Sequence, residues 1–337
     1  MVAEKKRGNS KDKVPRLMSD ADRFLEEGLV ATEEKIAFLL GADVPFVAEV
    51  LQYAAGSGGK RFRPRLTLLS AATAGVEQTS VADLAACVEC IHLATLLHDD
   101  VIDEASTRRG RPTTRRKFGN NLSILGGDYI LTRVFQYIAN EIEDRDILRI
   151  VLATANRMVA GEFLEMWRQA RLDMAEDEYI KMITLKSANL IEASCKLGGI
   201  AAGYDGSELE ALAGYGLNTG ISFQITDDCL DFSAEAGLLG KEEYGDVRSG
   251  KITLPIIFGL KSRKARAVAA AVEAIWDGES VENDLIDLLN DADAFGQARG
   301  RARRYAQMGK DALTAVPAGK ARDILADIAD WTWRRSF

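Results

Sequence analysis

Residues 81–103 read VADLAACVECIHLATLLHDDVID, an apolar segment that carries a cluster of aspartates. Leu84, Val88 and Ile91 recur with the spacing of one face of an α-helix. No alternating run of comparable length, which is the pattern of a strand, competes with this spacing. The segment therefore predicts a long apolar helix with several carboxylates on it.

Proline is scarce, and the middle of the chain has none. Of the six prolines, none lies between Pro112 and Pro255. Proline breaks helices and marks turns, so a span of that length without it favours helix after helix over a β-sandwich or an irregular fold. Breaks rich in glycine separate about ten to twelve predicted helices. The predicted fold class is all-α.

Composition sets further limits. Of 337 residues, 47% are hydrophobic, which is enough for a large core. No linker or change of composition divides residues 19–337, so they are predicted to form one domain, while the basic, non-periodic residues 1–18 are expected to be a disordered leader.

A net charge of −8 argues against nucleic-acid binding. Only four cysteines, and a start without a secretory signal, indicate a cytoplasmic protein.

An Asp-Asp-x-x-Asp cluster occurs twice, at Asp99, Asp100 and Asp103 and again at Asp227, Asp228 and Asp231. Residues four apart on a helix share a face, so the first and last aspartates of each cluster project together. Like charges at this spacing destabilise a helix, and aspartate is a poor helix former. A penalty repeated in this way favours a function over a solvated surface. Two such pairs facing each other would form a carboxylate cage.

Carboxylates in small number suit Mg²⁺, which keeps several waters and is completed by substrate phosphates. The expected ligand is therefore a phosphorylated small molecule. A zinc site is disfavoured, because the chain has only two histidines, His92 and His98. Its one CxxC pair, Cys87 and Cys90, lies in an apolar helical pattern that is typical of core packing.

Two basic turns supply cations for phosphates. Residues 58–65, GGKRFRPR, form a glycine-rich turn that runs into a helix with Pro64 near its start, and residues 108–112, RRGRP, follow the first aspartate cluster. Either turn alone is typical of solvated surface, but arginine beside a metal-binding carboxylate pair favours an anion clamp. The first turn lacks the spacing and the Ser or Thr of a P-loop, so nucleotide binding is not indicated.

Together these residues resemble the trans-polyprenyl diphosphate synthases, the head-to-tail prenyltransferases that include octaprenyl and decaprenyl diphosphate synthases. The similarity covers nearly all of residues 20–337. It is carried by GGKRFRP from Gly58, LLHDDVIDEASTRRGRPT from Leu96, GGDYILTRVF from Gly126, the pair Lys186-Ser187, FQITDDCLDF from Phe223, and LGK, GD and GKITLP between Leu239 and Pro255.

The resemblance implies an all-helical isoprenoid synthase fold around a deep central cavity, usually as a homodimer, that joins isopentenyl diphosphate repeatedly to an allylic diphosphate. It implies Mg²⁺ as the cofactor, with three ions per active site once substrate is bound. The metal would be coordinated by Asp99, Asp103 and Asp227, with Asp231 supporting them. The allylic diphosphate would be held by Arg108, Lys186, Lys241 and Lys251, and isopentenyl diphosphate by Lys60, Arg63, His92 and Arg109.

By the same resemblance, Lys186 and the metal-binding aspartates Asp99 and Asp103 would promote ionisation of the allylic diphosphate. Ser187 and Gln224 would face the carbocation, and the departed diphosphate would take the final proton, so no side-chain nucleophile is needed. Two positions depart from the family pattern. Tyr244-Gly245-Asp246 stands where Gly-Asp-Asp is usual, and Ser187 stands where Thr is usual; neither change removes a phosphate ligand.

Product length is expected to depend on the cavity wall below Asp99, where the positions four, five and eight residues earlier are Thr95, Ala94 and Ile91. In this family, bulky rings at the first two positions accompany short products and small residues accompany longer ones. The sequence thus predicts an octaprenyl to decaprenyl chain for a quinone, with its end set deeper, around Leu131 and Phe135 or Met158 and Phe163. The alternative is a short-chain farnesyl or geranylgeranyl diphosphate synthase.

Three other functions are open at the level of sequence. A class I terpene cyclase also ionises an allylic diphosphate, but its second cluster is of an Asn/Ser/Glu type and it would have no use for the cations Lys60, Arg63 and Arg109. A non-catalytic partner subunit would typically have lost one aspartate cluster, and a helical scaffold would need neither. For a long apolar product, transient contact with a membrane surface is a further expectation.

Overall fold

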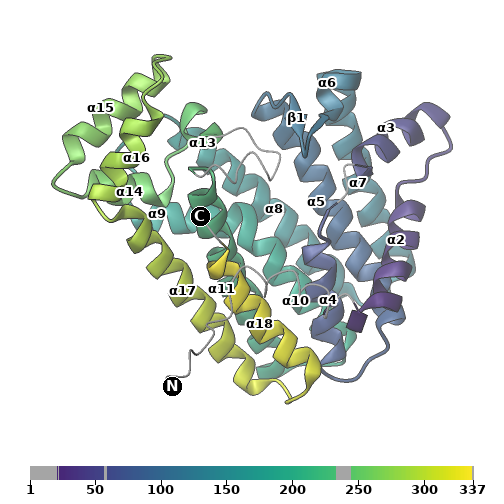
Figure 1. Ribbon diagram of the computed structural model, residues 1–337. Coiled ribbons are helices and arrows are strands. Elements are labelled where there is room, and N and C mark those ends of the chain that lie inside the picture. Colours follow the sequence, from purple (N-terminus) through teal and green to yellow (C-terminus); the bar gives the residue numbers. More distant parts are fainter. Residues whose placement is uncertain (1–20, 22, 57–58, 233–243, 336–337) are drawn as a thin grey trace, which may run out of the picture.

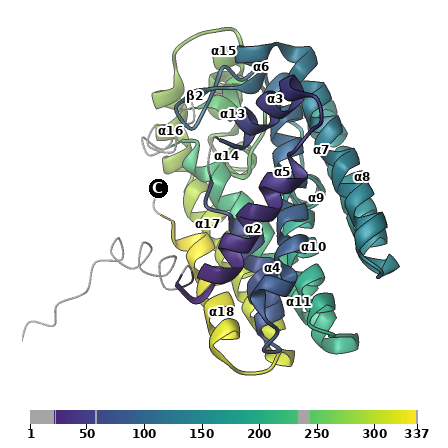
Figure 2. The same ribbon diagram turned by 90° about the vertical axis from the view of Figure 1, so that its right-hand side faces the viewer.

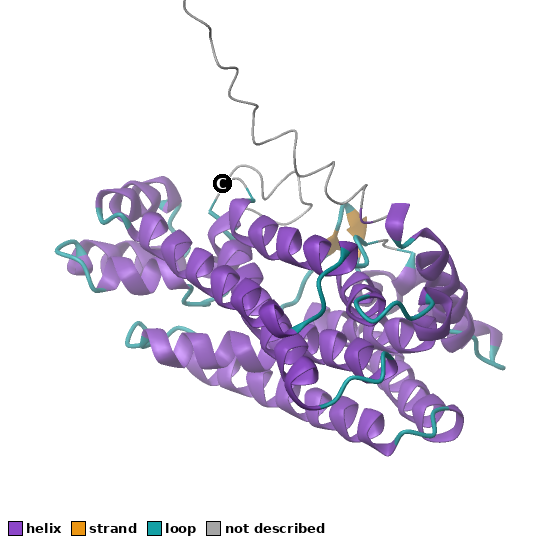
Figure 3. Cartoon of the chain, turned by 90° about the horizontal axis from the view of Figure 1, so that it is seen from below, coloured by secondary structure: helices purple, strands orange, loops and turns teal. Residues whose placement is uncertain are grey.

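The computed structural model describes residues 21, 23–56, 59–232 and 244–335, and these are almost entirely helical (Figure 1). The α-helices are α2 (Glu26–Leu39), α3 (Pro45–Ala55), α4 (Phe62–Ala72), α5 (Ala82–Ile102), α6 (Thr114–Phe118), α7 (Asn120–Glu141), α8 (Arg145–Arg168), α9 (Glu176–Ile183), α10 (Asn189–Ala201), α11 (Gly206–Leu230), α13 (Gly245–Arg248), α14 (Leu254–Leu260), α15 (Ala265–Trp276), α16 (Glu282–Asp291), α17 (Ala294–Ala312) and α18 (Lys320–Arg334). Two short 3₁₀ turns, η2 (Gln78–Val81) and η4 (Leu313–Ala315), and one π-helical turn, η3 (Thr184–Ala188), join some of them. The strands β1 (Thr107–Arg108) and β2 (Arg111–Pro112) pair antiparallel (Figure 3).

The all-α prediction is confirmed. The helices outnumber the ten to twelve expected, because short ones such as α13 fill segments that the sequence assigned to breaks. The expected leader, residues 1–18, lies outside the described residues, and so does Lys241.

Helix α5 is the long apolar helix that the sequence predicts. It packs against α2, α4 and α7 (Figures 1 and 2), and its residues from Leu84 to Ile91 are buried. By length and composition, Gln78–Ile102 is the one candidate membrane span in the described part of the chain, but 67% of its most apolar window is buried inside the protein. Cys87 and Cys90 belong to this core, where burial raises the pKa of the Cys90 thiol to about 12. Their position agrees with core packing.

Helix α11 is the second central helix. It packs against α10 and α17, and its glycines permit a close approach to α10 and η3. A Cβ on Gly216 would lie 2.8 Å from the Cα of Glu192 on α10, and a Cβ on Gly220 would lie 2.8 Å from the Cα of Ala188 on η3. Tyr215 in its middle belongs to an apolar core with α4 and α5, whereas Ile225 belongs to a second core with α14 to α17. The helix therefore spans both cores.

Both aspartate clusters lie at one end of the bundle (Figure 1), since α5 ends at Ile102 and α11 ends at Leu230. The chain that follows α11 contacts both ends. The Tyr244 N–H donates to the Asp231 carbonyl (3.0 Å), and Lys251 Nζ lies 3.0 Å from Asp103 Oδ2. This arrangement places the two clusters around a common site.

Candidate active site

The first aspartate cluster faces lysines from two distant segments. Asp103 caps the end of α5 and pairs with Lys251. Asp99, one turn earlier, is half-buried and lies close enough to Lys186 for the lysine to oppose the rise in its pKa that burial causes. The structure therefore brings together four residues that are far apart in the sequence and that the resemblance assigned to one site.

Helix α8 adds two carboxylates that the sequence analysis missed. Lys186 Nζ lies 2.7 Å from Glu162 Oε2 and 2.5 Å from Glu165 Oε1, and Lys251 Nζ lies 3.5 Å from the same Glu165 oxygen. Burial works to raise the pKa of Glu165, but Lys251 and Lys186 together hold it below its usual value. The sequence carries no distinct signal for this pair, because two glutamates three residues apart are ordinary in a helix.

The chemistry of the first cluster fits a divalent cation. Burial raises the pKa of Asp99 to about 7, and the charges of Glu162, Asp103 and Glu165 add to this although Lys186 opposes it. A cation bound here would relieve that repulsion. Within the described ranges, however, no three acidic, histidine or cysteine side chains gather closely enough to hold an ion by themselves. The cage that two facing aspartate pairs would form is thus not seen, and substrate oxygens must complete the coordination.

Each aspartate of the second cluster has a different partner. Asp227 Oδ1 lies 3.4 Å from Arg335 Nη1. Asp231 Oδ2 accepts the Asp246 N–H (3.1 Å), so this carboxylate supports the loop whose sequence departs from the family pattern. Asp228 is buried, and burial raises its pKa to about 8.

Arg335 reaches the site from the end of α18, and no local sequence pattern predicts it. Its guanidinium lies 4.0 Å from the ring centroid of Phe223 and 5.3 Å from that of Trp331, and its Nη2 donates to the Phe223 carbonyl (2.7 Å). Phe62 stacks on Phe223 with a centroid distance of 5.0 Å. These rings join α4, α11 and α18 beside Asp227, which the resemblance assigns to metal binding.

Four residues from three segments form a cationic site next to this aromatic group, as the resemblance implies: Lys60, Arg63, His92 and Arg109. Burial lowers the pKa of all four side chains, and neighbouring arginines lower each of these pKa values further. The four side chains therefore lie close to one another or to other arginines. The buried Nε of Arg63 has no hydrogen-bond partner among the residues that the structure describes. The Arg109 guanidinium packs so close to Gly59 that a Cβ there would lie 2.9 Å from Nη1. Crowded cations with an unsatisfied donor fit an anion.

Arg61 fixes the shape of the first basic turn. It adopts a left-handed conformation (φ 46°) directly before α4, and its guanidinium bridges Glu33 (2.5 Å) and Glu89 (3.0 Å). Because Glu89 is buried on α5, this contact ties the turn to the central helix. The neighbours Lys60 and Arg63 are thereby held on the side of the site.

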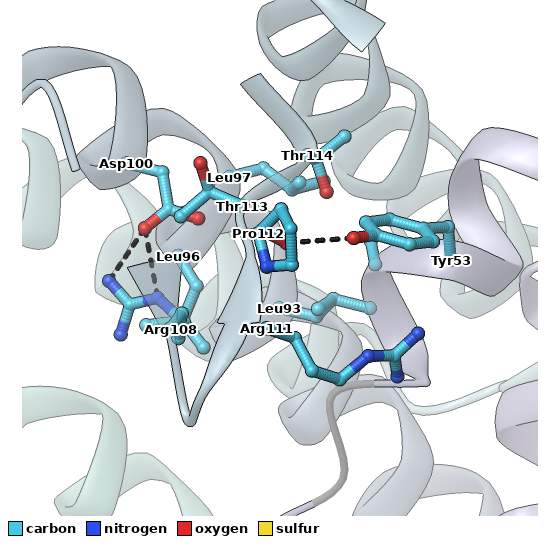
Figure 4. A pocket seen from close by; sticks show the side chains of 11 residues that line it. Tyr53, Leu93, Leu96, Leu97, Asp100, Arg108, Arg111, Pro112, Thr113 and Thr114 are labelled. Atoms are coloured by element: carbon cyan, nitrogen blue, oxygen red, sulfur yellow. Dashed lines mark hydrogen bonds and ion pairs between the residues drawn. The ribbon is translucent and has the colours of Figure 1, made fainter. Parts of the chain in front are cut away.

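Arg108 has a carboxylate partner of its own in this structure. Its Nε and Nη2 each lie 2.9 Å from Oδ1 of Asp100, the middle aspartate of the first cluster (Figure 4). The pair borders a small hollow between α5 and the β1–β2 hairpin, which Tyr53 closes by donating to the Pro112 carbonyl (2.8 Å). The hairpin is thus anchored to both α5 and α3.

Lys186 and Ser187 lie on the π-helical turn η3, an irregularity that is frequent at functional sites. The turn packs tightly on α8, since a Cβ on Gly161 would lie 2.5 Å from the backbone nitrogen of Lys186. Gly161 therefore sets the distance between Lys186 and the glutamates on α8.

The residues expected to set product length fall into two groups. Ile91 and Ala94 are fully buried in the core around α5, whereas Thr95 is half-buried and donates to the His92 carbonyl (2.8 Å). Met158, Leu131 and Phe135 are buried or packed against the same core. Phe163 was placed wrongly: its side chain is 70% exposed, because it lies about 100° around α8 from the half-buried Glu162, which faces Lys186.

An all-helical bundle with two aspartate clusters and a separate cationic site defines the isoprenoid synthase class. The chain belongs to the polyprenyl synthetase family, because residues 44–297 match the sequence model of that family. It is 33% identical over 322 residues to octaprenyl diphosphate synthase of Haemophilus influenzae. The alignment covers 95% of this chain and 98% of that relative. Relatives of comparable identity carry names from geranylgeranyl to nonaprenyl synthase, so the family as such leaves the product length open.

Solved structures agree with the fold. A polyprenyl synthase from Caulobacter crescentus, complexed with calcium and isoprenyl diphosphate, superposes with a TM-score of 0.88 at 33% identity, covering 94% of this chain and 98% of that one. A decaprenyl diphosphate synthase from Rhodobacter capsulatus gives a TM-score of 0.87 at 32% identity, covering 94% and 99%. The protein is a prenyltransferase of this family.

Proposed function

We propose that this prenyltransferase adds isopentenyl diphosphate repeatedly to an allylic diphosphate and makes a long all-trans chain, of octaprenyl to decaprenyl length, for a quinone. The observation that carries the two-substrate reaction is the presence of two separate groups of basic side chains, each of which could bind one diphosphate. One consists of Lys186 and Lys251 beside the first aspartate cluster, and the other is the cationic site of Lys60, Arg63, His92 and Arg109. A terpene cyclase, with one diphosphate to bind, would not need the second.

Ionisation of the allylic diphosphate is the first step. Asp99, Asp103 and Asp227, with support from Asp231, would hold Mg²⁺, which neutralises charge on the leaving diphosphate. Three ions per site are proposed from the family resemblance. Lys186 and Lys251 would move from their carboxylates to the diphosphate oxygens, with Arg108 and Lys241 as further ligands.

Condensation depends on positioning. Burial and the arginines around His92 lower its pKa far below the usual value, so it would act as a neutral hydrogen-bond donor to isopentenyl diphosphate. The double bond of that substrate attacks the allylic carbon, and the departed diphosphate then removes the proton that restores a double bond. Ser187 and Gln224 would face the positive charge between these steps.

The long product is proposed from the wall below Asp99. Thr95 and Ala94 place no large ring at these two positions of α5, and Met158 and Phe135 belong to, or pack against, the core in which Ala94 is buried. A growing prenyl product directed between α5, α7 and α8 would therefore meet no large ring at the first two positions below Asp99.

A homodimer is proposed from the outer surface of α7 and α8. Large apolar side chains are exposed there in one patch: Ile124, Leu125, Leu152, Val159, Phe163, Met166 and Trp167. Side chains of this size, exposed together on two adjacent helices, are typical of an interface between subunits. A second copy of the chain is the proposed occupant, in accord with the family resemblance, and a cytoplasmic location with transient membrane contact during product release completes the proposal.

The test is a product-length assay with Mg²⁺, labelled isopentenyl diphosphate and farnesyl diphosphate as the primer. Products that extend well beyond twenty carbons would support the long-chain assignment. Chains that end at fifteen or twenty carbons from shorter primers would refute it and leave a short-chain synthase. No elongation from any primer would refute the two-substrate reaction.

A further inference from the structure

A buried chain of hydrogen bonds links α9 to α11 at the second aspartate cluster. The Tyr179 hydroxyl donates to Asp228 Oδ2 (2.6 Å), and the side-chain nitrogen of Gln224 donates to Asp228 Oδ1 (2.7 Å). Tyr179 is fully buried, and Asp228 nearly so. The roles proposed above use Gln224 but neither of the other two residues.

These hydrogen bonds determine the orientation of the Gln224 carboxamide. Each oxygen of Asp228 accepts one of these hydrogen bonds, Oδ1 from the Gln224 amide nitrogen and Oδ2 from the Tyr179 hydroxyl, so both oxygens already have a donor in the structure. The amide nitrogen of Gln224 must therefore face Asp228, and its carbonyl oxygen must lie on the other side of the amide. The carbonyl oxygen is the end of the amide dipole that stabilises positive charge.

We propose that Tyr179 is a positioning residue, which through Asp228 holds Gln224 with its carbonyl oxygen toward the reacting allylic carbon. The inference rests on the proposed role of Gln224. Without the Tyr179 hydroxyl, Oδ2 of a buried carboxylate loses its donor, which is costly. The carboxylate turns to recover a donor, and Gln224 turns with it.

Tyr179 is also well placed to keep the site together. It lies on α9, and α9 continues without a break into the π-helical turn η3 that carries Lys186. Asp228 lies next to Asp227 on α11. One hydroxyl therefore ties the segment with the diphosphate-binding lysine to the helix with the second metal-binding cluster.

The test is the steady-state kinetics of Tyr179→Phe, Gln224→Ala and the double variant in the full-length protein with Mg²⁺ and both substrates. Tyr215→Phe is the matched control, because Tyr215 is equally buried and donates to the Leu325 carbonyl (2.8 Å) away from the site. We expect Tyr179→Phe to lower kcat by about 10- to 100-fold and to leave both KM values within about twofold. Tyr215→Phe should keep its kcat.

The double variant separates positioning from general damage. If Tyr179 acts through Gln224, Tyr179→Phe should change kcat by less than about twofold in the Gln224→Ala background. Equal losses in both backgrounds, a change confined to KM, or an unchanged kcat would overturn the inference.

Two further measurements keep the test decisive. If Tyr179→Phe does not fold, Asp228→Asn leaves only one acceptor oxygen, so the side chain can no longer accept from both Tyr179 and Gln224. Its loss of kcat must likewise disappear in the Gln224→Ala background, and an additive loss would overturn the inference. A wild-type protein that forms no product would instead refute the proposed two-substrate reaction, so the two failures are distinguishable.

Discussion

The guanidinium of Arg335 lies 3.4 Å from the carboxylate of Asp227, so a residue at the end of the chain pairs with an aspartate expected to bind metal. Phe223 and Trp331 hold the guanidinium in this position. A cation bound at Asp227 must compete with Arg335 for the same oxygens. The C-terminal end of α18 is therefore part of the site.

Arg335→Gln should raise the affinity of the substrate-free protein for a divalent cation, by roughly 3- to 10-fold, because it removes a competing charge. Titration with Mn²⁺ followed by electron paramagnetic resonance measures this affinity. Arg334→Gln is the matched control, since Arg334 is 55% exposed and pairs with Asp330. Equal affinities in the two variants would show that Arg335 does not compete.

Gly161→Ala should disrupt the contact between α8 and the π-helical turn. The added methyl group would lie 2.5 Å from the backbone nitrogen of Lys186, so one of the two segments must move. We expect a loss of about 1–3 kcal/mol in the free energy of unfolding, together with reduced kcat. Gly300→Ala on α17 is the control, since a Cβ there meets nothing within 4 Å and should stabilise the helix by roughly 0.5–1 kcal/mol. Similar effects of the two substitutions would contradict the packing argument.

Arg61→Gln should destabilise the protein through Glu89, which would remain buried without its partner. The expected loss is about 3 kcal/mol in urea unfolding. The double variant with Glu89→Gln should recover part of that loss, because no buried charge is then left alone. The exposed pair of Arg149 and Asp146 provides the comparison, where Arg149→Gln should cost less than about 1 kcal/mol. Strictly additive losses in the double variant would show that the pair is not coupled.

Thr95→Phe should shorten the product, because a ring would enter the wall below Asp99. Leu96→Phe is the control, since Leu96 lines the hollow beside the β1–β2 hairpin (Figure 4). Ala94→Phe is a less clean test of the same idea, as Ala94 is fully buried and overpacking costs about 1–3 kcal/mol. Chromatography of the dephosphorylated products gives the chain lengths. An unchanged product in Thr95→Phe would rule out this direction for the growing chain.

Phe163→Asp should dissociate the proposed dimer, because it places a charge in the middle of the apolar patch on α7 and α8. Light scattering coupled to size exclusion measures the mass. Met308→Asp, on the exposed side of α17 away from that patch, should leave the assembly unchanged. A wild-type protein that is monomeric, or a variant that keeps the wild-type mass, would contradict the assignment of this surface.

The sequence predicted the helices and the residues with strong local patterns, and it missed those that depend on tertiary packing. The apolar period of α5, the lack of proline and the repeated aspartates are local signals, and each led to a feature that the structure contains. Glu162 and Glu165 lie in an ordinary helical pattern and become significant only because η3 places Lys186 against them.

Arg335 and Tyr179 were missed for a related reason. Their partners are 108 and 49 residues away in the sequence, and only the fold brings each pair together. Phe163 was assigned to the interior because spacing along α8 does not say which face is covered by the rest of the chain. The number of helices was underestimated because short helices such as α13 have too few residues to show a period.

The lysines directed at the leaving group already have carboxylate partners, Lys186 with Glu165 and Lys251 with Asp103. An enzyme that extends one chain many times must discard an inorganic diphosphate after every addition. Carboxylates that recapture the lysines as the anion departs offset part of the free energy lost on its release. Under the proposed function, the ion pairs that weaken the first binding of substrate would therefore also reduce inhibition of the enzyme by its own by-product.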